Sequence, residues 1–393
     1  MSCIHVYNSS HKEGREKMNV KRLISIMLCV LLVFLTGCWD SLEINERLFI
    51  TAIGVDLNTD PEAKGRYSVT YVYPNVGALG KNPSQKEVKS VITTTAETPY
   101  EASRQITTRT SNPFFFKHLK VIVIGEELFK RPELIREYFD GLAREYAVNR
   151  KIGIIVAEGS AKDVVSTKVE ELAIIGGYLN SMLKNNKNAQ RFTDQTFSQI
   201  IKDHYFSNAS FAPRAIPKAK EYKISGAAII KDYKLVGWIG EKENRALSLI
   251  RDHLKSEIFN AKYKDATIDY VISQHKSNKK VSKESDKLSV DLNIFLEGYI
   301  EQYKLGEKID TFNRDFIDTV ESKIEDVVTE EIKGLVNKLQ SEYNADVIGI
   351  GEYLCKFKPD IWDDVKDQWD EVFPNIDINV NVVVRIRRTG LTK

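Results

Sequence analysis

The chain contains one long apolar run, close to its N-terminus. Residues Leu23–Leu35, LISIMLCVLLVFL, make a run of 13, whereas a helix needs about 20 apolar residues to cross the hydrocarbon core of a bilayer. The run has the length of the apolar core of a secretory signal, about 7–15 residues, and Lys21 and Arg22 precede it as the positive flank. We therefore predict that residues 1–37 are a cleaved signal peptide rather than a short anchor that stays attached. Met18 is a second candidate start.

A cysteine directly follows the small residues that end this run. Leu35-Thr36-Gly37-Cys38 resembles the lipobox of bacterial lipoproteins. The expected chemistry is attack of the Cys38 thiolate on a diacylglycerol donor, which gives an S-diacylglycerol thioether. Cleavage between Gly37 and Cys38 then frees the Cys38 amine for N-acylation. The alternative is an ordinary signal peptide with a chance cysteine. Two or more acyl chains, at about 0.8 kcal/mol per buried methylene, attach a protein to a membrane stably.

Cysteine usage and charge exclude several classes of protein. After removal of residues 1–37, Cys38 and Cys355 remain. With Cys38 lipidated, no intramolecular disulfide or cysteine metal site can form, and we expect Cys355 to be a small core residue. The mature chain has 52 basic and 53 acidic residues, a net charge of −1. Nucleic-acid-binding proteins normally show a basic excess, so we expect no nucleic-acid partner.

The segment 38–215 alternates predicted strands with predicted helices, which indicates a mixed α/β region of one or two subdomains. The pattern RYSVTYVYP (Arg66–Pro74) predicts a half-buried strand, because polar and apolar residues alternate in it. Thr98 is a predicted helix N-cap with Pro99 at the first helical position. Ser160 is predicted to cap the short helix AKDVVS that follows it.

A domain boundary is predicted in or near Ser207–Lys223, which contains two prolines and several small residues, so that 216–393 forms a C-terminal α+β region. It begins with a predicted β-hairpin whose turn lies near Asp232-Tyr233. Two further strands are predicted at TIDYVISQHK and KLSVDLNIFLEGYI, and the charged SNKKVSKESD between them is interpreted as a solvated loop. The overall prediction is an α+β, multidomain protein of two to three mixed α/β domains.

The strongest periodic pattern predicts a long amphipathic helix at about 309–343. Apolar residues recur there mainly at three- and four-residue steps, which places them on one helical face. The pattern is not a clean heptad with charged flanks, so we expect the helix to pack across a sheet rather than to form a coiled coil. The residues of this face are Ile309, Phe312, Phe316, Val320, Ile324, Val327, Ile332, Leu335, Leu339 and Tyr343.

No catalytic, metal or cofactor motif is found. The four histidines of the mature chain have no second His or Cys at metal-ligand spacing; they are His118, His204, His253 and His275. The G-x-G of GIGEY (Gly349–Tyr353) lacks the third glycine of a dinucleotide fingerprint. Trp362 and Trp369 lie seven apart, as on one helical face, which favours core packing over a carbohydrate platform. We therefore predict a protein that is not an enzyme and holds no cofactor or metal.

Four stretches together resemble the Ger(x)C family, the lipoprotein C subunits of bacterial spore germinant receptors. They are GCWDSLEINERLFITAIGVD, then HLKVIVIGEEL with the downstream REYAVNRKIGIIVAEGSAKDVV, then GAAIIKDYKLVGWIGEKENRAL, and finally EYNADVIGIGEYL with KPDIWDDVKDQWDEVFP. The resemblance covers essentially all of the mature chain. It departs from the family pattern at Arg144-Glu145-Tyr146-Ala147.

The resemblance implies a three-domain, mixed α/β, non-enzymatic lipoprotein on the outer face of the inner spore membrane. Its implied partners are an integral-membrane A subunit that senses nutrients and a B subunit related to transporters. Two other hypotheses stay open at this point. A solute-binding lipoprotein of a membrane transporter would need two lobes and a deep polar cleft. An envelope hydrolase would need a pocket that gathers His and carboxylates from distant segments.

The sequence also leaves open the role of an aromatic group. Tyr71, Tyr73 and the run Phe114-Phe115-Phe116 fit either an exposed interface or a buried core.

Overall fold

The computed structural model describes residues 22, 24–27, 47–74, 89–167, 175–185, 191–218, 221–254, 256–264, 266–284, 287–303 and 313–388. Two compact units result, Met1–Arg47 and Leu48–Lys393. In the first, Arg22 and residues 24–27 are helical. The predicted signal cleavage site and Cys38 lie outside the described residues. No helix among the described residues is both long and apolar enough to span a bilayer.

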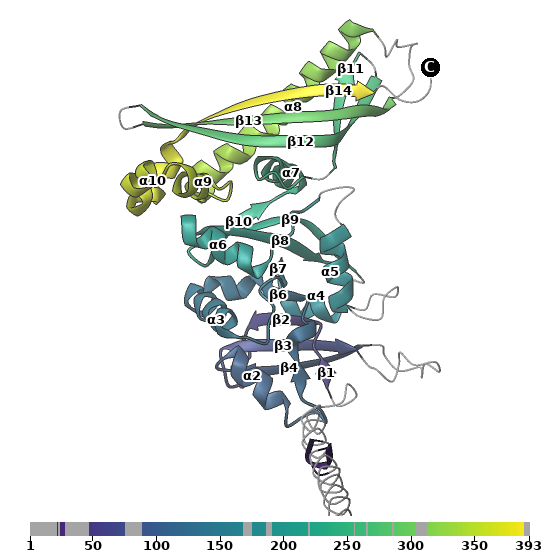
Figure 1. Cartoon of the computed structure of the whole chain (residues 1–393), viewed down its shortest axis with the longest axis vertical. Coiled ribbons are helices and arrows are strands. Elements are labelled where there is room, and N and C mark those ends of the chain that lie inside the picture. Colours follow the sequence, from purple (N-terminus) through teal and green to yellow (C-terminus); the bar gives the residue numbers. More distant parts are fainter. Residues whose placement is uncertain are drawn as a thin grey trace, which may run out of the picture. The chain divides into compact units, whose positions relative to one another are not determined.

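An eight-stranded mixed sheet occupies the N-terminal part of the larger unit, in the order β10-β9-β8-β7-β6-β2-β3-β4. Its four central strands are parallel, and antiparallel hairpins extend it at both edges. The strands are β2 (Ala52–Leu57), β3 (Tyr67–Pro74), β4 (Lys89–Ala96), β6 (Val121–Gly125), β7 (Gly153–Ala157), β8 (Ala209–Pro217), β9 (Tyr222–Lys231) and β10 (Lys234–Ile239) (Figure 1). A separate parallel pair joins β1 (Leu48–Phe49) to β5 (Phe114–Phe115).

Helices cover both faces of this sheet. On one face pack α2 (Pro99–Ile106), α3 (Pro132–Arg144) and α6 (Phe197–Ser207). On the other pack α4 (Ala161–Ser166) and α5 (Ile175–Asn185). Strands covered on two sides must be apolar at every position, which explains the runs VIVIG and GIIVA, buried throughout. The prediction that β3 is half-buried was wrong for the same reason, because Tyr67 and Val69–Val72 are all buried.

Local sequence signals determine several of these elements as predicted. The Thr98 side chain accepts a hydrogen bond from the Glu101 amide (3.1 Å) and caps α2, with Pro99 in the first turn. Asp232 and Tyr233 both have positive φ (49° and 64°) and form the two-residue turn between β9 and β10. That backbone geometry matches the twist of the two strands in a hairpin.

The segment in which the boundary was predicted contains the strand β8, which lies in the interior of the sheet. A proline cannot donate a ladder hydrogen bond and is tolerated at a bulge. The register of β8 against β9 shifts between Pro213 and Ala215, which accommodates Pro213. The sheet therefore continues across residue 216, and the division into domains there stays a prediction.

The second sheet has four strands, in the order β11-β12-β13-β14. They are β11 (Ile258–Tyr263), β12 (Ala266–Glu284), β13 (Lys287–Tyr303) and β14 (Asp377–Arg388), and β14 runs parallel to β13. The charged segment interpreted as a loop is strand through Glu284 and pairs with β13 along its length. It was mistaken for a loop because its polar residues fill the exposed face, while Val281 turns inward and is buried.

The long amphipathic helix is confirmed as α8 (Arg314–Lys338), followed by a π-helical turn, Leu339–Tyr343. It lies across the second sheet (Figure 1), with Phe316, Val320, Ile324, Ile332 and Leu335 buried in the same core as the strands. The predicted members Ile309 and Phe312 fall outside the described residues. Val327 is only partly buried.

Two glutamates of α8 hydrogen-bond the edge strand β14. Glu325 Oε1 accepts from the Val384 amide (2.9 Å) and Glu321 Oε1 accepts from the Ile386 amide (2.7 Å). These contacts satisfy backbone donors that an edge strand would otherwise leave free. The helix therefore both covers the sheet and protects part of its edge.

The cap of α4 comes from a distant residue. Ser160 occupies the N-cap position but makes no capping hydrogen bond, so that prediction was wrong. Instead Asp56, at the end of β2, accepts from the amides of Ala161 (2.7 Å) and Lys162 (2.9 Å) and from the Ser160 hydroxyl (3.2 Å). A carboxylate at a helix N-terminus satisfies unpaired amides and opposes the helix dipole. The Ile-Gly-x-Asp stretch of the family resemblance thus has a structural role.

A second carboxylate holds the G-x-G stretch of GIGEY. Asp346 accepts from the amides of Gly349 (2.8 Å), Ile350 (3.0 Å) and Gly351 (2.7 Å) at the start of α9 (Ile350–Phe357). Gly349 has a φ of 79°, which favours glycine. Amides that could have met a phosphate are therefore occupied by the protein's own carboxylate.

Short helices complete the C-terminal region. Trp362 in α10 (Pro359–Val365) and Trp369 in α11 (Trp369–Val372) meet edge to face with ring centroids 5.2 Å apart. The helix is interrupted between them at Lys366–Gln368, so they do not share one continuous helical face. Trp369 is buried in the core and Trp362 packs against it, as the core-packing interpretation expected.

Candidate functional site

A charged cavity lies between α6, which packs on the first sheet, and the C-terminal region. It has a volume of about 300 Å³. Four elements supply its walls: α6, the turn after α7 (Glu241–Ile250), the strand β12 and the helix α9. The lining residues are Gln195, Gln199, Lys202, Asp203, Arg251, His253, Lys279, Gly349, Glu352, Tyr353, Lys356 and Phe357.

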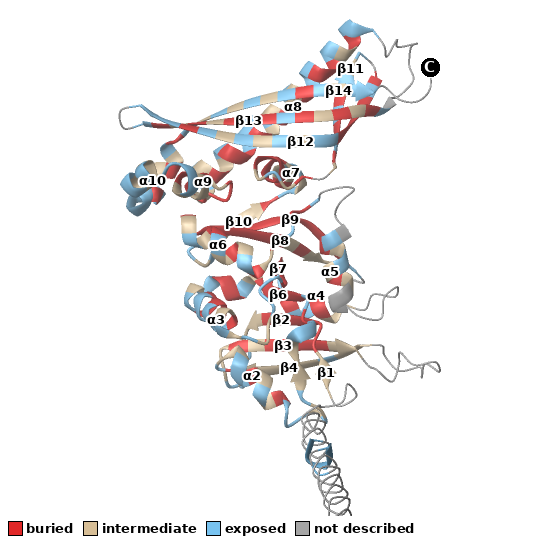
Figure 2. Ribbon diagram, viewed as in Figure 1, coloured by how far each residue is buried: buried red, intermediate tan, exposed pale blue. Residues whose placement is uncertain are grey.

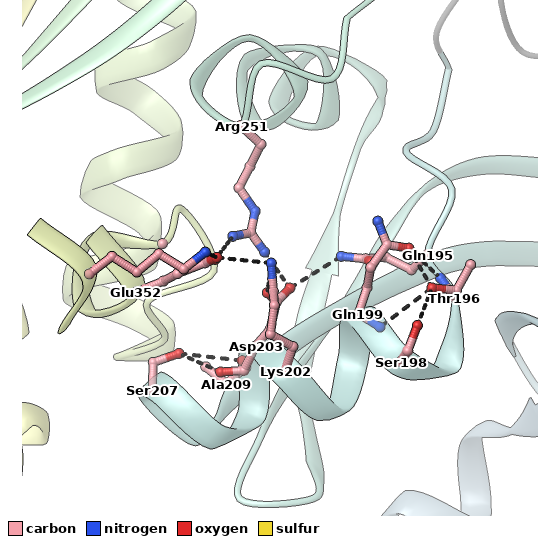
Figure 3. A network of polar contacts seen from close by, with 12 residues as sticks. Gln195, Thr196, Ser198, Gln199, Lys202, Asp203, Ser207, Ala209, Arg251 and Glu352 are labelled. Atoms are coloured by element: carbon pink, nitrogen blue, oxygen red, sulfur yellow. Dashed lines mark hydrogen bonds and ion pairs between the residues drawn. The ribbon is translucent and has the colours of Figure 1, made fainter. Parts of the chain in front are cut away.

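A network of ion pairs crosses this cavity (Figure 3). The Arg251 guanidinium contacts Asp203 through Nη2 and lies 3.4 Å from Glu352 Oε2 through Nη1. Glu352 Oε1 also meets Lys202 Nζ at 3.0 Å and Lys356 Nζ at 2.6 Å. The network therefore joins α6 to α9 through one arginine and one glutamate.

The central members of the network are well buried. Their side chains are 4% (Asp203), 9% (Arg251) and 15% (Glu352) exposed. Gln195 donates to Asp203 Oδ2 (3.3 Å), and the Arg251 guanidinium lies 5.5 Å from the centre of the Phe211 ring. Charges removed from water are tolerated only when they are paired and hydrogen-bonded, and these contacts meet that requirement for the two carboxylates.

The environment shifts the protonation of several groups. Burial by itself would raise the pKa of Glu352, but hydrogen bonds from Lys356 and Lys202 outweigh it and lower that pKa to about 2. Burial raises the pKa of Asp203, and the charges of Arg251 and Lys202 oppose the rise. Burial lowers the pKa of Lys279 to about 8, and the Arg251 charge acts in the same direction. Such clustered shifts in a cavity are typical of functional sites.

A second cavity is apolar. It has a volume of about 360 Å³ and lies over the first sheet between α2 and α3, with Ile53, Val69, Tyr71 and Tyr138 in its lining. Two of its three carboxylates form ion pairs: Glu137 with Arg66 (2.9 Å) and Asp140 with Arg144 (2.9 Å). The third, Glu145, accepts from the Ala147 amide (3.0 Å). Its lining is mainly apolar, whereas charged side chains dominate the first cavity.

The structure separates the histidines that the sequence singled out. His118 packs against the rings of Phe49 and Phe115, His204 against Tyr233, and His275 lies 3.1 Å from Asp252. Only His253 lines the charged cavity. Within the described ranges, no group of three or more His, Cys, Asp or Glu side chains is placed to hold a metal ion.

The remaining predicted residues have mixed outcomes. Gly37 and Cys38 lie outside the described residues, so lipid attachment stays a prediction. Cys355 is a free thiol in α9 and is half-buried rather than a fully buried core residue. Of the aromatic group, Tyr71 is buried and Tyr73, Phe114 and Phe116 pack against the same core, which favours the core interpretation for these four.

Sequence reasoning missed the charged cavity because its members are far apart in the chain. Arg251 lies 48 residues from Asp203 and 101 residues from Glu352. Glu352 lies in the GIGEY stretch, but no short motif contains two of the three residues. Only Lys279 carries a local sign of its role. It is a charged residue at an inward-facing position of β12, in the part of the strand that was mistaken for a loop.

Family models match nearly all of the chain beyond residue 40. The model described as Spore germination protein N-terminal domain matches residues 40–215. The model described as Spore germination B3/GerAC like, C-terminal, matches residues 225–390. The chain therefore belongs to this family of spore germination proteins, the Ger(x)C family that the sequence resembles.

Individual relatives agree with this assignment. Spore germination protein YndF of Bacillus subtilis strain 168 is 28% identical over 409 residues, with 96% of this chain and 99% of YndF covered. Spore germination protein B3 of the same strain is 24% identical, covering 95% of this chain and 99% of B3. Spore germination protein KC of that strain is also 24% identical, covering 94% and 96%.

A solved structure shares the fold. The crystal structure of the GerBC protein aligns with a TM-score of 0.55 at 19% sequence identity, covering 85% of this chain and 97% of that chain. The predicted α+β, multidomain class is therefore confirmed, including the C-terminal sheet packed by a long helix.

Proposed function

We propose that this protein is the lipid-anchored, non-catalytic C subunit of a spore germinant receptor and is needed for nutrient-triggered germination. The observation that carries the proposal is the match of both family models, which together account for most of residues 40–390. The first matched residue comes two positions after Cys38, so the lipid would sit directly at the start of the matched region.

The attachment follows from the sequence Leu35–Cys38. Export would expose Cys38 to lipidation, and its acyl chains would hold the body on the outer face of the inner spore membrane. There it would meet two integral-membrane partners, the A and B subunits. A lipid anchor of this kind constrains one end of the chain to the bilayer surface and raises the local concentration of membrane partners.

The non-catalytic role is supported by the chemistry of the charged cavity. A general base works best with a pKa near the operating pH, whereas the pKa of Glu352 is about 2 because two lysines hydrogen-bond it. Asp203 is engaged by Arg251. Glu352 therefore stays charged and holds its basic partners in place. The family assignment favours a receptor subunit over the solute-binding and hydrolase alternatives.

The decisive experiment replaces the lipidated cysteine. In spores that express the full chain with its A and B subunits, Cys38→Ala is expected to release the protein from the membrane fraction and to abolish most of the nutrient-triggered germination. Loss of the thiolate removes the lipid acceptor while leaving the described body unchanged. Membrane fractionation, acyl-chain mass spectrometry and germination rate are the measurements.

Cys355→Ala is the matched control, because it removes the other cysteine of the mature chain from a half-buried position in α9. It should keep both lipid and germination. Normal germination by Cys38→Ala spores with normal protein abundance would overturn the lipid-dependent role. A lipid still found on the Cys38→Ala protein would overturn the assignment of the site.

A further inference from the structure

The charged cavity between α6 and α9 contains more positive than negative charge. Four of its lining residues are basic, namely Lys202, Arg251, Lys279 and Lys356, and two are acidic, Asp203 and Glu352. With all six ionised, two positive charges are left uncompensated within the cavity. The cations around a shared cavity repel one another, and an anion that entered it would relieve this repulsion.

Two donor side chains that line the cavity, Arg251 and Lys279, have N–H groups without a hydrogen-bond acceptor among the described residues. Arg251 Nε has no hydrogen-bond partner, although its side chain is only 9% exposed. Lys279 Nζ donates to the carbonyl of Ile250 (3.1 Å), and no described carboxylate forms an ion pair with it. An ammonium carries three donors. A buried donor left unpaired costs about 1–3 kcal/mol, so both groups would gain from an acceptor in the cavity.

The size and border of the cavity limit what it can accept. A volume of about 300 Å³ lies at the small end of the range for ligand sites. Gln195 and Gln199 add side-chain amides to the wall. Tyr353 and Phe357 form its apolar border, with ring centroids 5.0 Å apart. The ring of Phe357 is unusually exposed, at 65%.

We propose that this cavity binds a small dianion of the carboxylate or phosphate class, held by Arg251, Lys279 and Lys356. Two negative charges match the excess of two positive charges. The oxygens of the ligand accept from Arg251 Nε and from the ammonium groups of the two lysines. The Tyr353–Phe357 pair offers a surface for any apolar part of the ligand.

The position of the cavity gives such binding a structural consequence. Asp203 and Lys202 belong to the segment matched by the N-terminal family model, and the remaining charged groups belong to the segment matched by the C-terminal one. A ligand held by Arg251, Lys279 and Lys356 joins the turn after α7, the strand β12 and the helix α9. Because it binds the folded state alone, it stabilises the protein by mass action. This inference does not depend on the receptor role.

The test is isothermal titration calorimetry on the full chain in detergent micelles. The probes are sodium sulfate, sodium phosphate and sodium succinate, with sodium acetate and sodium chloride as monovalent comparisons at constant ionic strength. We expect saturable binding of at least one dianion, about tenfold or more tighter than acetate. Sulfate and phosphate binding without succinate binding identifies the phosphate class, and the reverse identifies dicarboxylates.

Variants assign the binding to this cavity. Lys279→Gln removes a buried ammonium and should weaken dianion binding about tenfold or more. Lys356→Gln removes a half-exposed ammonium and should weaken it about two- to fivefold. Lys366→Gln is the matched control, since Lys366 is similarly exposed (45% against 50%) and also pairs with a carboxylate one helical turn away. Lys366 lies outside the cavity, so Lys366→Gln should bind the dianion as tightly as the native chain does.

A pH series gives a second readout. Groups that face Lys279 include Arg251, Asp252, Asp346 and Glu352, with Lys202, Asp203, His253 and Lys356 around the same cavity. Between about pH 7 and about pH 9 sulfate keeps its charge, and among these groups Lys279 loses its proton, because its pKa is about 8. Sulfate affinity should therefore fall over this range in the native chain and stay level in Lys279→Gln.

Three results would overturn the proposal. One is the absence of saturable binding by all three dianions. Another is equal loss of affinity in Lys366→Gln and Lys356→Gln, which would indicate general surface attraction. The third is unchanged affinity in Lys279→Gln. Circular dichroism establishes that each variant is folded, and Lys356→Gln carries the test if Lys279→Gln does not fold.

Discussion

The two sheets of this protein bury their apolar side chains in different ways. The eight-stranded sheet has helices on both faces, and its central strands are buried at successive positions, as at Val123 and Ile124. The four-stranded sheet has α8 on one face only. Buried and exposed residues alternate along its strands (Figure 2). On its other face Phe295 and Val383 are 37% and 38% exposed, and the Asn381 side chain donates to that of Asn293 (3.2 Å).

This difference explains which strands could be recognised. Parallel strands covered on two sides appear as continuous apolar runs, so β6 and β7 are evident in the sequence. In a sheet that is covered on one side, buried apolar residues alternate with exposed residues along each strand. The exposed positions tolerate any polar residue. In β12 these positions are lysines, serines and asparagines, and a strand with such a face resembles a solvated loop.

The largest effect is expected from the helix that covers the second sheet. Ile324 in α8 is fully buried, and Ile324→Ala should lower the free energy of unfolding by about 3–4 kcal/mol, because it leaves a cavity against the sheet. Urea unfolding measures the change. Lys323→Ala, at the exposed neighbouring position, should stay within about 0.5 kcal/mol. A cost below about 1 kcal/mol for Ile324→Ala would mean that α8 is not the principal cover.

The two-sided burial of the first sheet can be tested with one chemical change on each face. Val123 faces the core of α4 and α5, and Val156 faces the core of α2, α3 and α6. Each Val→Ala change should cost about 2–3 kcal/mol, from the lost apolar burial and the residual cavity. Thermal and urea unfolding are the measurements. If one substitution were neutral, that face would not be tightly covered.

The junction between the two regions should show an acid-dependent contribution to stability. The folded pKa of Glu352 is lowered from 4.5 to about 2. A depressed carboxyl pKa stabilises the fold above the unfolded value, and this contribution is lost as the pH falls from about 4.5 to about 2. The full shift corresponds to about 3 kcal/mol, and solvent screening of this partly buried group reduces it. Glu352→Gln should therefore cost about 2 kcal/mol at pH 7 and flatten the stability profile over that window. An unchanged acid slope in the variant would contradict the role assigned to Glu352.

The smallest effect is expected on the exposed face of the second sheet. Val383 and Val384 are neighbours in β14, with exposures of 38% and 0%. Val383→Ala should change the free energy of unfolding by less than about 0.5 kcal/mol, whereas Val384→Ala should cost about 2 kcal/mol. Equal costs, measured by urea unfolding, would show that the outer face is covered as well and that the two sheets do not differ as described.

Much of the fold could be predicted because its signals are local. The cap at Thr98, the turn at Asp232-Tyr233 and the apolar face of α8 each depend on residues within a few positions of one another. The cap of α4 could not be predicted, because Asp56 lies 105 residues from the Ala161 amide that it accepts from. Ser160 is a residue type that caps helices and occupies the N-cap position, but the Asp56 carboxylate, from the strand β2, accepts the hydrogen bonds of the first amides of α4.

The candidate site residues also fall into two groups, one with a local sequence signal and one without. Cys38 could be predicted as the lipidated residue because the lipobox that it resembles is a short linear motif. The charged cavity depends on groups from α6, β12, α9 and the turn after α7, and a charge in the sequence carries no information about whether it will be buried. Residue patterns thus specify most of the elements and the family, and they predict an export signal. Burial, which sets the partners and pKa values of Asp203, Lys279 and Glu352, arises when those elements pack together.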